Sequence, residues 1–329
     1  MTVIRKLNIF DKSKIKELRS FLNYEDENLF IDILTNGIPG HLHYYLPLKY
    51  KFLNESFLLE DKKRILGLIT ANTFSGNYRK INISQLLFIE NAYEVAQQLV
   101  EFVLSQYGAM GADTFFVMVD DVYTELAQMF VNKCSFRQCS SEQIWESTKL
   151  SFKKDKNLKY RRFRKSDVKE VADIYNDSVL THFKPTLLRM ESEFWESDFS
   201  GLKYANEYRY VIEESGTSRI IAYFKIMTAD NEKYVVDFNY SNGYDIDFDS
   251  ILSSATREIL KRTKKFKLYL KTKSYTNTSG AQVEYLLSNG FKCISTKNIF
   301  VKDYFRVVKE YSPEERFAVL GGLHNSPSF

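Results

Sequence analysis

The chain repeats itself once, and this repeat limits the folds that it can adopt. Two pairs of segments match at one spacing of 155 residues, and a looser third pair keeps the same order. The matched pairs are Arg64–Ile69 with Arg219–Phe224, Ser135–Ser140 with Gly290–Ser295, and Arg5 and Asp11 with Arg162 and Asp167. One such similarity could arise by chance, but three in the same order indicate a duplicated unit. We therefore expect two copies of one fold.

The length supports the same division. At roughly 150 residues per domain, 329 residues provide two domains. The charged stretch 153–157 is typical of a solvated linker, and Ser312, Pro313 and Glu314 have the order of a helix start. We place a first domain at 1–150, a second domain at 151–310, and a short C-terminal helix with a tail at 311–329.

Composition excludes several classes of protein. The 46 Lys and Arg exceed the 42 Asp and Glu by only 4, too few to indicate nucleic acid or an anionic membrane as a partner. No apolar run reaches the ~20 residues of a membrane helix, and no targeting segment is visible. Three cysteines are too few for a disulfide framework. We expect a cytoplasmic protein with no membrane partner and no specific nucleic-acid partner, and its oligomeric state stays open.

Both halves predict the same order of elements. Each has a short strand, a helix, a hairpin of two strands, a third strand, an amphipathic helix, a further strand and helix, and a final strand. In the second half, the hairpin covers Tyr208–Glu213 and Ile220–Ile226, and the third strand covers Tyr234–Tyr240. A final strand after Phe136 or Phe291 is expected to close its own half. The pattern predicts an α+β domain of about 150 residues, built twice.

This order of elements resembles the GNAT acyltransferase family. Arg162–Asp167 resembles the family's opening strand and helix start, Ile65–Ile69 resembles the second strand of its hairpin, and Glu284–Phe291 resembles its closing helix and Gly-Phe turn. The resemblance covers nearly all of both halves. It implies two consecutive GNAT-like domains, each a mixed, mostly antiparallel sheet flanked by helices. It also implies acetyl-CoA as the acyl donor and an amine, on a small molecule or a peptide, as the acceptor.

The resemblance places the pyrophosphate of coenzyme A at the loop between the third strand and the long helix. Small residues there let backbone amides approach the phosphates, and the helix start adds a favourable partial charge. Glu94 takes a glycine position in the first loop, and Asp245 or Asp247 does so in the second. Acids in a first helical turn are also common without any ligand, and their charge disfavours phosphate binding. We slightly favour the first loop. The cofactor-binding candidates are Ile89, Asn91, Glu94, Val95 and Ala96 in the first half, and Asn242, Gly243 and Tyr244 in the second.

The resemblance also implies that an amine attacks the thioester directly, while a carboxylate takes the proton and a tyrosine protonates the thiolate. The candidate bases are Glu90 and Asp237, and Asp237 stands in an apolar strand where burial can raise its pKa. Neither half has a tyrosine at the family's position, so the candidate acids are the neighbouring Tyr285 and Tyr123. Packing or surface roles are the alternative interpretation for all four side chains.

Three histidines fall in the regions where the family binds its acceptor. His41 and His43 alternate and would share one face of an extended chain, and His182 lies in the corresponding region of the second half. Two imidazoles without a third ligand make a poor metal site, so we expect no metal. The three histidines are candidate substrate-binding residues, and packed or solvated histidines are the simpler alternative.

Three functions compete. The first is acyl-CoA-dependent N-acyl transfer, most simply acetyl transfer to an amine. The second is a GNAT-like ligand-binding or interaction protein that has lost catalysis, which the acids in both loops and the missing tyrosine favour. The third is transfer from an aminoacyl-tRNA, which the near-neutral charge disfavours because tRNA binding needs a basic surface. We favour the first because the whole predicted fold fits it.

Overall fold

The computed structural model describes residues 2–8, 11–15, 18–20, 55–74, 77–89, 91–153, 159–194, 207–214, 216–228, 231–244 and 246–304. Three predicted site residues, His41, His43 and Glu90, lie outside the described residues, as does the predicted C-terminal helix.

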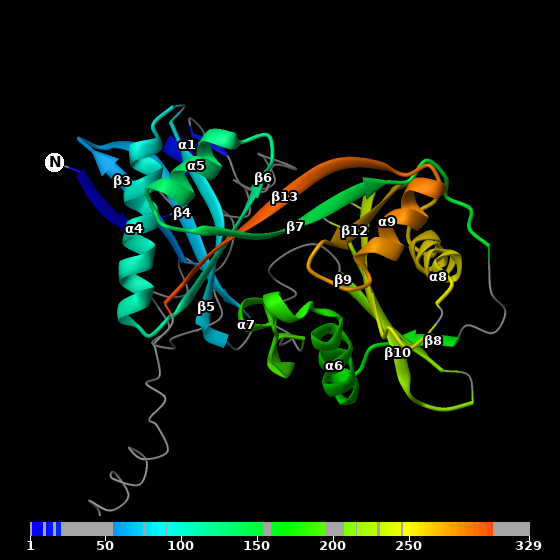
Figure 1. Cartoon of the computed structure of the whole chain (residues 1–329). Helices are drawn as coiled ribbons and strands as arrows, with labels where there is room; N and C mark the ends of the chain where they lie inside the picture. Colours follow the sequence, from blue (N-terminus) through cyan, green and yellow to red (C-terminus); the bar gives the residue numbers. More distant parts are fainter. Residues whose placement is uncertain are drawn as a thin grey trace, which may run out of the picture.

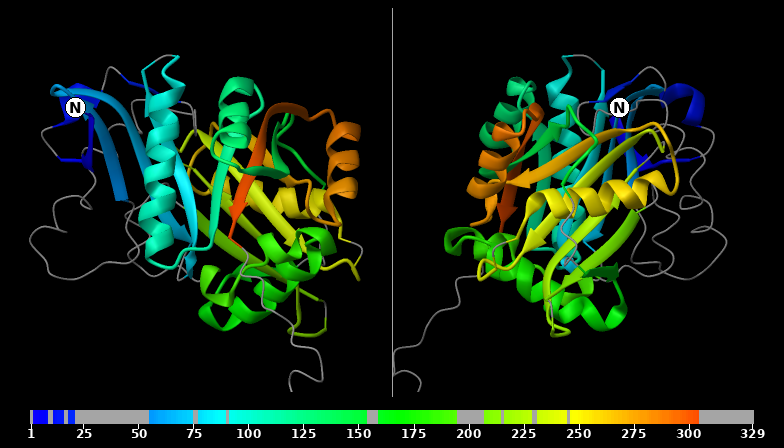
Figure 2. Two further views of the ribbon diagram at one scale, coloured as in Figure 1. Left: turned by 60° about the vertical axis from the view of Figure 1, so that its left-hand side comes forward. Right: turned by 90° about the vertical axis from the view of Figure 1, so that its right-hand side faces the viewer.

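In its described residues, the first half contains one long helix, two shorter helices and seven strands. In chain order they are β1 (Thr2–Lys6), α1 (Lys12–Ile15), β2 (Arg19–Ser20), β3 (Glu55–Asp61), β4 (Arg64–Phe74), β5 (Asn77–Phe88), α4 (Tyr93–Ala109), β6 (Thr114–Asp120), α5 (Thr124–Asn132) and β7 (Arg137–Glu146). Figure 2 shows α4 lying across the strands of this half.

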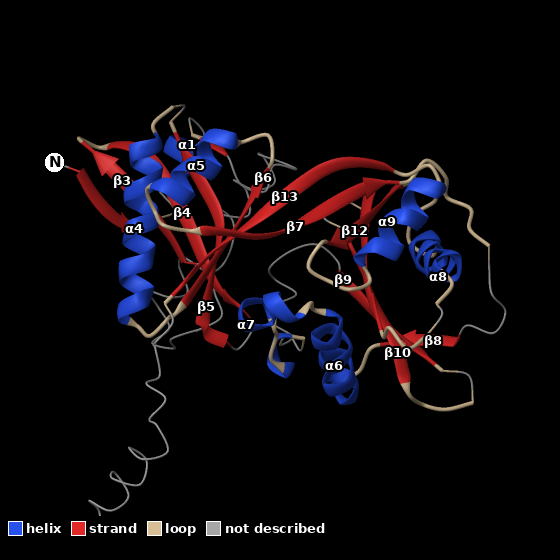
Figure 3. Cartoon of the chain, in the orientation of Figure 1, coloured by secondary structure: helices blue, strands red, loops and turns tan. Residues whose placement is uncertain are grey.

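The second half repeats this order with additional short helical turns. Its elements are β8 (Lys159–Arg162), η2 (Lys165–Asp167), α6 (Val168–Ser178), η3 (Thr181–Phe183), α7 (Lys184–Leu187), η4 (Glu191–Glu193), β9 (Glu207–Glu213), β10 (Ile220–Met227), β11 (Lys233–Tyr240), α8 (Phe248–Leu260), β12 (Lys267–Lys273), α9 (Ser279–Ser288) and β13 (Lys292–Asp303). Figure 3 shows α6 below the strands of the second half and α7 nearer the first half, close to one end of β5.

All strands in the described residues belong to one continuous sheet, and the two halves exchange their final strands. The strand order is β1-β3-β4-β5-β6-β13-β7-β12-β11-β10-β9-β8, with β2 paired to β5 off this path. Thus β13 of the second half pairs with β6, β7 of the first half pairs with β12, and β7 and β13 pair antiparallel with each other. The two long strands run side by side from one half to the other (Figure 1).

This exchange corrects the expectation that each final strand closes its own half. β7 and β13 come from equivalent positions of the repeat, so each fits the place that the other would take. Inside the halves, β5 pairs in parallel with β6 and β11 pairs in parallel with β12, while the other neighbouring strands pair antiparallel. Each half is therefore an α+β unit whose mixed sheet is completed by the other half.

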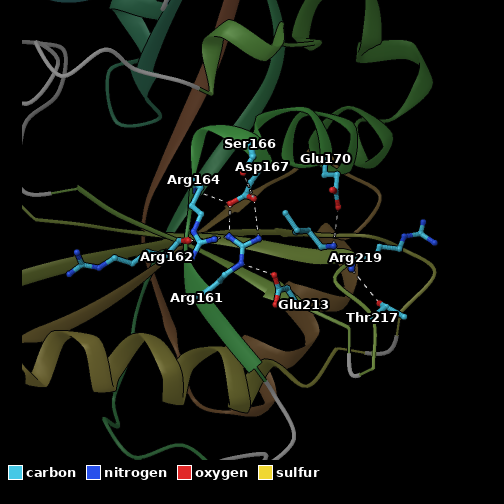
Figure 4. Close-up of polar contacts among 10 residues, drawn as sticks. Arg161, Arg162, Arg164, Ser166, Asp167, Glu170, Glu213, Thr217 and Arg219 are labelled. Atoms are coloured by element: carbon cyan, nitrogen blue, oxygen red, sulfur yellow. Dashed lines mark hydrogen bonds and ion pairs between the residues drawn. The ribbon is translucent and has the colours of Figure 1, made fainter.

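A three-residue ionic contact ties the edge strand to the first helix in both halves. In the first half, Arg5 donates to Glu60 at 2.7 Å and to both carboxylate oxygens of Asp11 at 2.7 and 2.8 Å. In the second half, Arg161 makes the same contacts to Glu213 and Asp167, as Figure 4 shows. The sequence comparison paired Arg5 with Arg162, and this was wrong by one residue. Successive strand residues point to opposite faces, so only Arg161 can replace Arg5.

The helices cover separate apolar clusters on the sheet. In the first half, α4 and α5 bury their apolar faces against β3 to β6, with Leu99, Val103 and Phe130 fully buried. In the second half, α8 packs on β10 to β12, and α6 covers the opposite face. No helix in the described part of the chain is long and apolar enough to cross a membrane.

Gly67 on β4 sets how closely the start of α4 approaches the sheet. A methyl group on Gly67 would lie 2.7 Å from Val95 Cγ1, 2.9 Å from Leu99 Cδ1 and 3.1 Å from the Leu87 carbonyl oxygen. Val95 is β-branched and has little freedom to rotate away. A side chain at position 67 would therefore push the first turns of α4 off the sheet.

We predict that Gly67→Ala lowers the free energy of unfolding by roughly 1–3 kcal/mol, as overpacking of a dense core does. The control is Gly108→Ala, because a methyl group on this α4 glycine meets nothing within 4 Å. Replacing a helical glycine should stabilise by roughly 0.5–1 kcal/mol. Urea unfolding measures both. Equal stabilities for the two variants would contradict this account of Gly67.

Candidate functional site

In the first half, the parallel strands β5 and β6 part, and we call this divergence the first cleft and its counterpart between β11 and β12 the second cleft. β5 and β6 pair in parallel from Lys80 with Thr114 to Ile83 with Val117, and β5 then runs on without β6 to Phe88. The register between β4 and β5 shifts at this point, so that Ser84 is the extra residue of a β-bulge. Bulges bend a strand and redirect its backbone, and they recur beside active sites. The splayed strands and the bulge together form the mouth of the first cleft.

A buried row of polar side chains leads across the sheet to this bulge. The Ser56 hydroxyl lies 2.8 Å from that of Thr70, which donates to Gln85 Oε1 at 2.6 Å. Thr70 and Gln85 are both almost fully buried. Buried polar groups are expensive unless they are satisfied, so a connected row fixes the orientation of the Gln85 amide. The sheet next to the bulge therefore holds an ordered row of polar side chains.

The start of α4 stands at the mouth of the first cleft. Ala92 occupies the N-cap position, and no side chain makes a cap hydrogen bond there. Asn91 has a left-handed backbone (φ +63°), which asparagine tolerates. Glu94 is exposed, whereas Val95 packs against Gly67 and Ala96 is fully buried in the core. The Ala96 side chain therefore cannot contact a ligand, and its amide donates to the Ala92 carbonyl oxygen at 3.4 Å. The helix start still has the partial positive charge of its amides.

The second half has the same parting of strands, but its cleft is filled by charged side chains. β11 and β12 pair from Lys233 with Lys267 to Asp237 with Lys271 and then diverge. Beyond that point, Lys273 Nζ of β12 donates to Asp237 at 2.5 Å and to Asn239 at 3.0 Å, both on β11. Lys273, Asp237 and Asn239 are 4 %, 4 % and 6 % exposed. This buried bridge spans the gap that a ligand would need to enter.

A second ion pair lies beside this bridge. Lys271 contacts the carboxylate of Glu142 on β7, which also accepts a hydrogen bond from the Tyr275 hydroxyl at 2.9 Å. Because β7 belongs to the first half, the exchanged strand supplies part of the charge that fills the second cleft.

The start of α8 is also occupied from within the chain. Asp247 Oδ1 accepts from the Asp249 amide at 3.1 Å, and Asp247 Oδ2 accepts from the Ser250 hydroxyl at 2.6 Å. The Tyr285 hydroxyl, on α9, donates to Asp249 Oδ1 at 2.5 Å. A carboxylate thus takes the place at the helix start that an anionic ligand would occupy.

These contacts set the acid–base properties of the predicted catalytic residues in the second half. Burial would raise the pKa of Asp237, but the charges of Lys273 and Lys271 outweigh it and hold that pKa well below its usual range. Burial lowers the pKa of Lys273 to about 8, against the attraction of Asp237. Burial and the bond to Asp249 raise the pKa of Tyr285 above its usual value. Asp237 is consequently a weak base, whereas burial alone was expected to raise its pKa and make it a stronger one. Tyr285 is a weaker acid than an ordinary tyrosine.

The remaining predicted residues lie apart from these contacts. Tyr123 is at the N-cap position of α5 and packs against the first core, and Ile89 packs under β4. His182 is exposed beside Phe183 in η3. Asn242 and Gly243 are exposed, and Tyr244 lies under the guanidinium of Arg219. The roles proposed for these side chains stay predictions. Among the described residues, no group of three His, Cys, Asp or Glu is placed to hold a metal ion.

Sequence reasoning missed Lys273, although a signal for it was present. Lys271 and Lys273 alternate at the end of an apolar strand, so both point to one face of the sheet. Asp237 and Asn239 alternate in the same way on the neighbouring strand. Two lysines opposite an acid and an amide predict a buried ionic contact, provided that the strand register is known.

Duplicated α+β halves, each with splayed parallel strands and a helix start at their mouth, define a tandem GNAT-like fold. A tandem GNAT protein of the clavulanic acid biosynthesis pathway has a similar structure, with a TM-score of 0.61 and 8% identity over 92% of this chain and 98% of that one. A GCN5-related N-acetyltransferase from Sphaerobacter thermophilus gives 0.58 and 8% identity over 92% and 95%. A putative acetyltransferase from Pyrococcus horikoshii gives 0.53 and 9% identity over 92% and 90%. No protein-family model and no curated protein matches the sequence. The tandem GNAT-like fold predicted from the sequence is confirmed.

We predict that Lys273→Met destabilises the protein by about 3–5 kcal/mol at pH 7, because it leaves the buried Asp237 carboxylate without its partner. The unpaired carboxyl should then have a raised folded pKa. A folded pKa above the unfolded value of roughly 3.9 lowers the free energy of unfolding at any higher pH. The loss of stability caused by Lys273→Met should therefore shrink as the pH falls from 7 towards 4.

The double variant Asp237→Asn/Lys273→Met removes the charge and should recover much of the loss. Lys133→Met, at an exposed lysine, is the control and should change little. Urea unfolding at pH 7 and pH 5 tests all of them. A Lys273→Met deficit that is the same at both pH values would argue against an unpaired carboxylate as its cause.

Proposed function

We propose that this protein is an acyl-CoA-dependent N-acyltransferase that binds its acyl-CoA in the first half alone. One observation carries the proposal: the two equivalent clefts differ in what fills them. The second cleft holds the Lys273–Asp237 bridge, and a carboxylate caps its helix. The first cleft has a bulged strand at its mouth, and its helix start has no side-chain cap.

The first cleft suits the parts of such a donor. Its pyrophosphate would lie at the start of α4, where backbone amides and the helix dipole favour an anion. The acyl donor would supply an activated thioester carbonyl. An acceptor amine would form the new C–N bond at that carbon as the C–S bond breaks, and the ammonium proton would pass to a base. Glu90 remains our candidate base and Tyr123 our candidate acid for the departing thiolate, and acetyl is the acyl group that we favour.

The alternative function is a GNAT-like protein that binds a ligand without catalysis. The filled second cleft and the exposed Glu94 at the first favour it. The two functions differ in turnover: an enzyme consumes acetyl-CoA when supplied with a suitable amine, and a binding protein does not.

Calorimetric titration with acetyl-CoA tests the proposal. We expect one site per chain, and a thiol-release assay with a panel of amines and peptides should then show turnover. Two sites per chain would contradict the assignment to one half. No heat and no thermal shift at millimolar acetyl-CoA would exclude the acyl-CoA proposal.

We predict that Glu94→Lys tightens the binding of acetyl-CoA by roughly 5–10-fold at low salt, because it replaces a like charge near the pyrophosphate with an opposite one. The matched control is Glu125→Lys, which reverses an exposed acid in the first turn of α5. It should leave the affinity within twofold of the unaltered protein. If both variants tighten binding equally, the effect reflects net charge alone and the site is not at α4.

A further inference from the structure

One corner of the first half holds a carboxylate between a cation and a phenol. Glu55, the first residue of β3, accepts from Lys6 Nζ at 2.8 Å and from the Tyr107 hydroxyl at 2.6 Å. Lys6 ends the edge strand β1, and Tyr107 lies in the last turns of α4. The positive charge of this corner is therefore neutralised by the chain itself.

The duplication locates the same corner in the second half. Arg162 is the last residue of the edge strand β8, as Lys6 is of β1. The pairing of β8 with β9 repeats that of β1 with β3, which places Tyr208 at the position of Glu55. The carboxylate of the first corner is thus replaced by a phenol in the second.

The helix contributes a second change. α4 begins at Tyr93 and α8 at Phe248, 155 residues apart, so Arg262 corresponds to Tyr107. Its guanidinium stacks on the Tyr208 ring, 3.6 Å from the ring centroid. The second corner therefore has arginines where the first has a lysine and a tyrosine, and it has lost the acid between them.

A groove of about 550 Å³ occupies this corner. The residues that line it are Tyr160, Arg161, Arg162, Tyr210, Glu258, Lys261 and Arg262. Arg161 is engaged by Asp167 and Glu213, whereas Arg162 points away from that network (Figure 4). Arg162 is exposed, and among the described residues its side chain has no hydrogen bond or ion pair.

The one acid among these lining residues is already satisfied. Glu258 accepts from the hydroxyls of Tyr160 at 3.0 Å and Tyr210 at 2.9 Å, and from Lys261 Nζ at 2.5 Å. Arg262 lies 3.9 Å from Oε2, the oxygen that accepts from Tyr210, and donates to the Glu258 carbonyl oxygen. Because Glu258 is buried and shared among three donors and Arg262, it leaves the positive charge of Arg162 uncompensated.

The surrounding charge points the same way. Segments 159–165 and 257–267, which meet at the groove, hold eleven Lys and Arg and a single Glu. They carry a net charge of +10 in a chain whose net charge is +4. Asp167, Glu213 and Glu146, which lie outside these segments, pair with Arg161 and Lys267 and offset part of this charge. The small overall charge conceals one strongly basic region, and such a region concentrates anions from solution.

We propose that this groove is a binding site for a small oxyanion, a carboxylate or phosphate group of a metabolite, held between Arg162 and Arg262. The ligand group supplies the negative charge that the Glu55 carboxylate supplies in the first half. Arginine presents a planar fork of donors that matches both kinds of group. The site lies at the C-terminal end of α8, and the second cleft lies at the other end of this helix, so the site is separate from both clefts.

Thermal unfolding and calorimetric titration of the full chain test this proposal, with inorganic phosphate in one arm and malonate in the other at constant ionic strength. We expect a saturable rise in Tm with at least one of the two anions, because a ligand of the folded state stabilises it. Saturation by phosphate identifies a phosphate site, and saturation by malonate identifies a carboxylate site.

Two variants remove the site in different ways. Arg162→Gln deletes the free cation, and Tyr208→Glu restores the carboxylate of the first half. Both should weaken anion binding at least tenfold. The affinity of Tyr208→Glu is compared by calorimetry at a temperature where this variant is folded, because it also removes the ring on which Arg262 stacks. Arg64→Gln, which removes an exposed arginine of the first half, is the matched control and should bind as the unaltered protein does.

Three results would overturn the proposal. The first is an unaltered protein that responds to neither anion. The second is an equal response from Arg162→Gln and the unaltered protein. The third is saturable binding of an oligonucleotide or of poly-glutamate with no response to either small anion, since the groove would then be part of a surface for a macromolecular polyanion.

Discussion

The antiparallel pairing of β7 with β13 is the contact on which the rest of this structure depends. It joins two sheets into one, and it places the last strand of each half inside the other. Each half has an unfilled strand position without its partner, and an unpaired strand edge buried in protein is costly. The two halves are therefore parts of one folding unit, although their sequences are repeats. β7 also brings Glu142 to Lys271, so the exchange reaches into the second cleft.

The two halves share the ionic contact that ties the edge strand to the first helix, but they differ at their clefts and corners. The Arg5 and Arg161 contacts are the same in both halves, with the same donors, acceptors and bidentate geometry. The clefts and corners differ: the first half has an open strand bulge and a filled corner, and the second has a filled cleft and an open corner. An exchanged sheet explains why a half with a closed cleft persists, because the first half needs β13 to complete its own sheet.

The sequence predicted the repeat, the α+β class and the order of elements, because these follow from periodicity and from long apolar segments. It did not predict the strand exchange, since β7 and β13 have equivalent patterns and either place buries the same alternating residues. Asp237 was correctly placed in a buried strand, but the sign of its pKa shift was wrong. That sign depends on Lys273, which lies 36 residues away and meets Asp237 only through the β11–β12 pairing. The alignment of Arg162 with Arg5 failed because a shift of one residue reverses the face of a strand.

The central claim is that acyl-CoA binds to the first half and not to the second. Hydrogen–deuterium exchange of the full chain, with and without saturating acetyl-CoA, tests it most directly. The account predicts slower exchange in peptides that cover 84–96, at the bulge and the start of α4, and unchanged exchange at 237–250. Protection confined to 237–250 would contradict it, because the ligand would then occupy the half whose cleft the Lys273–Asp237 bridge fills.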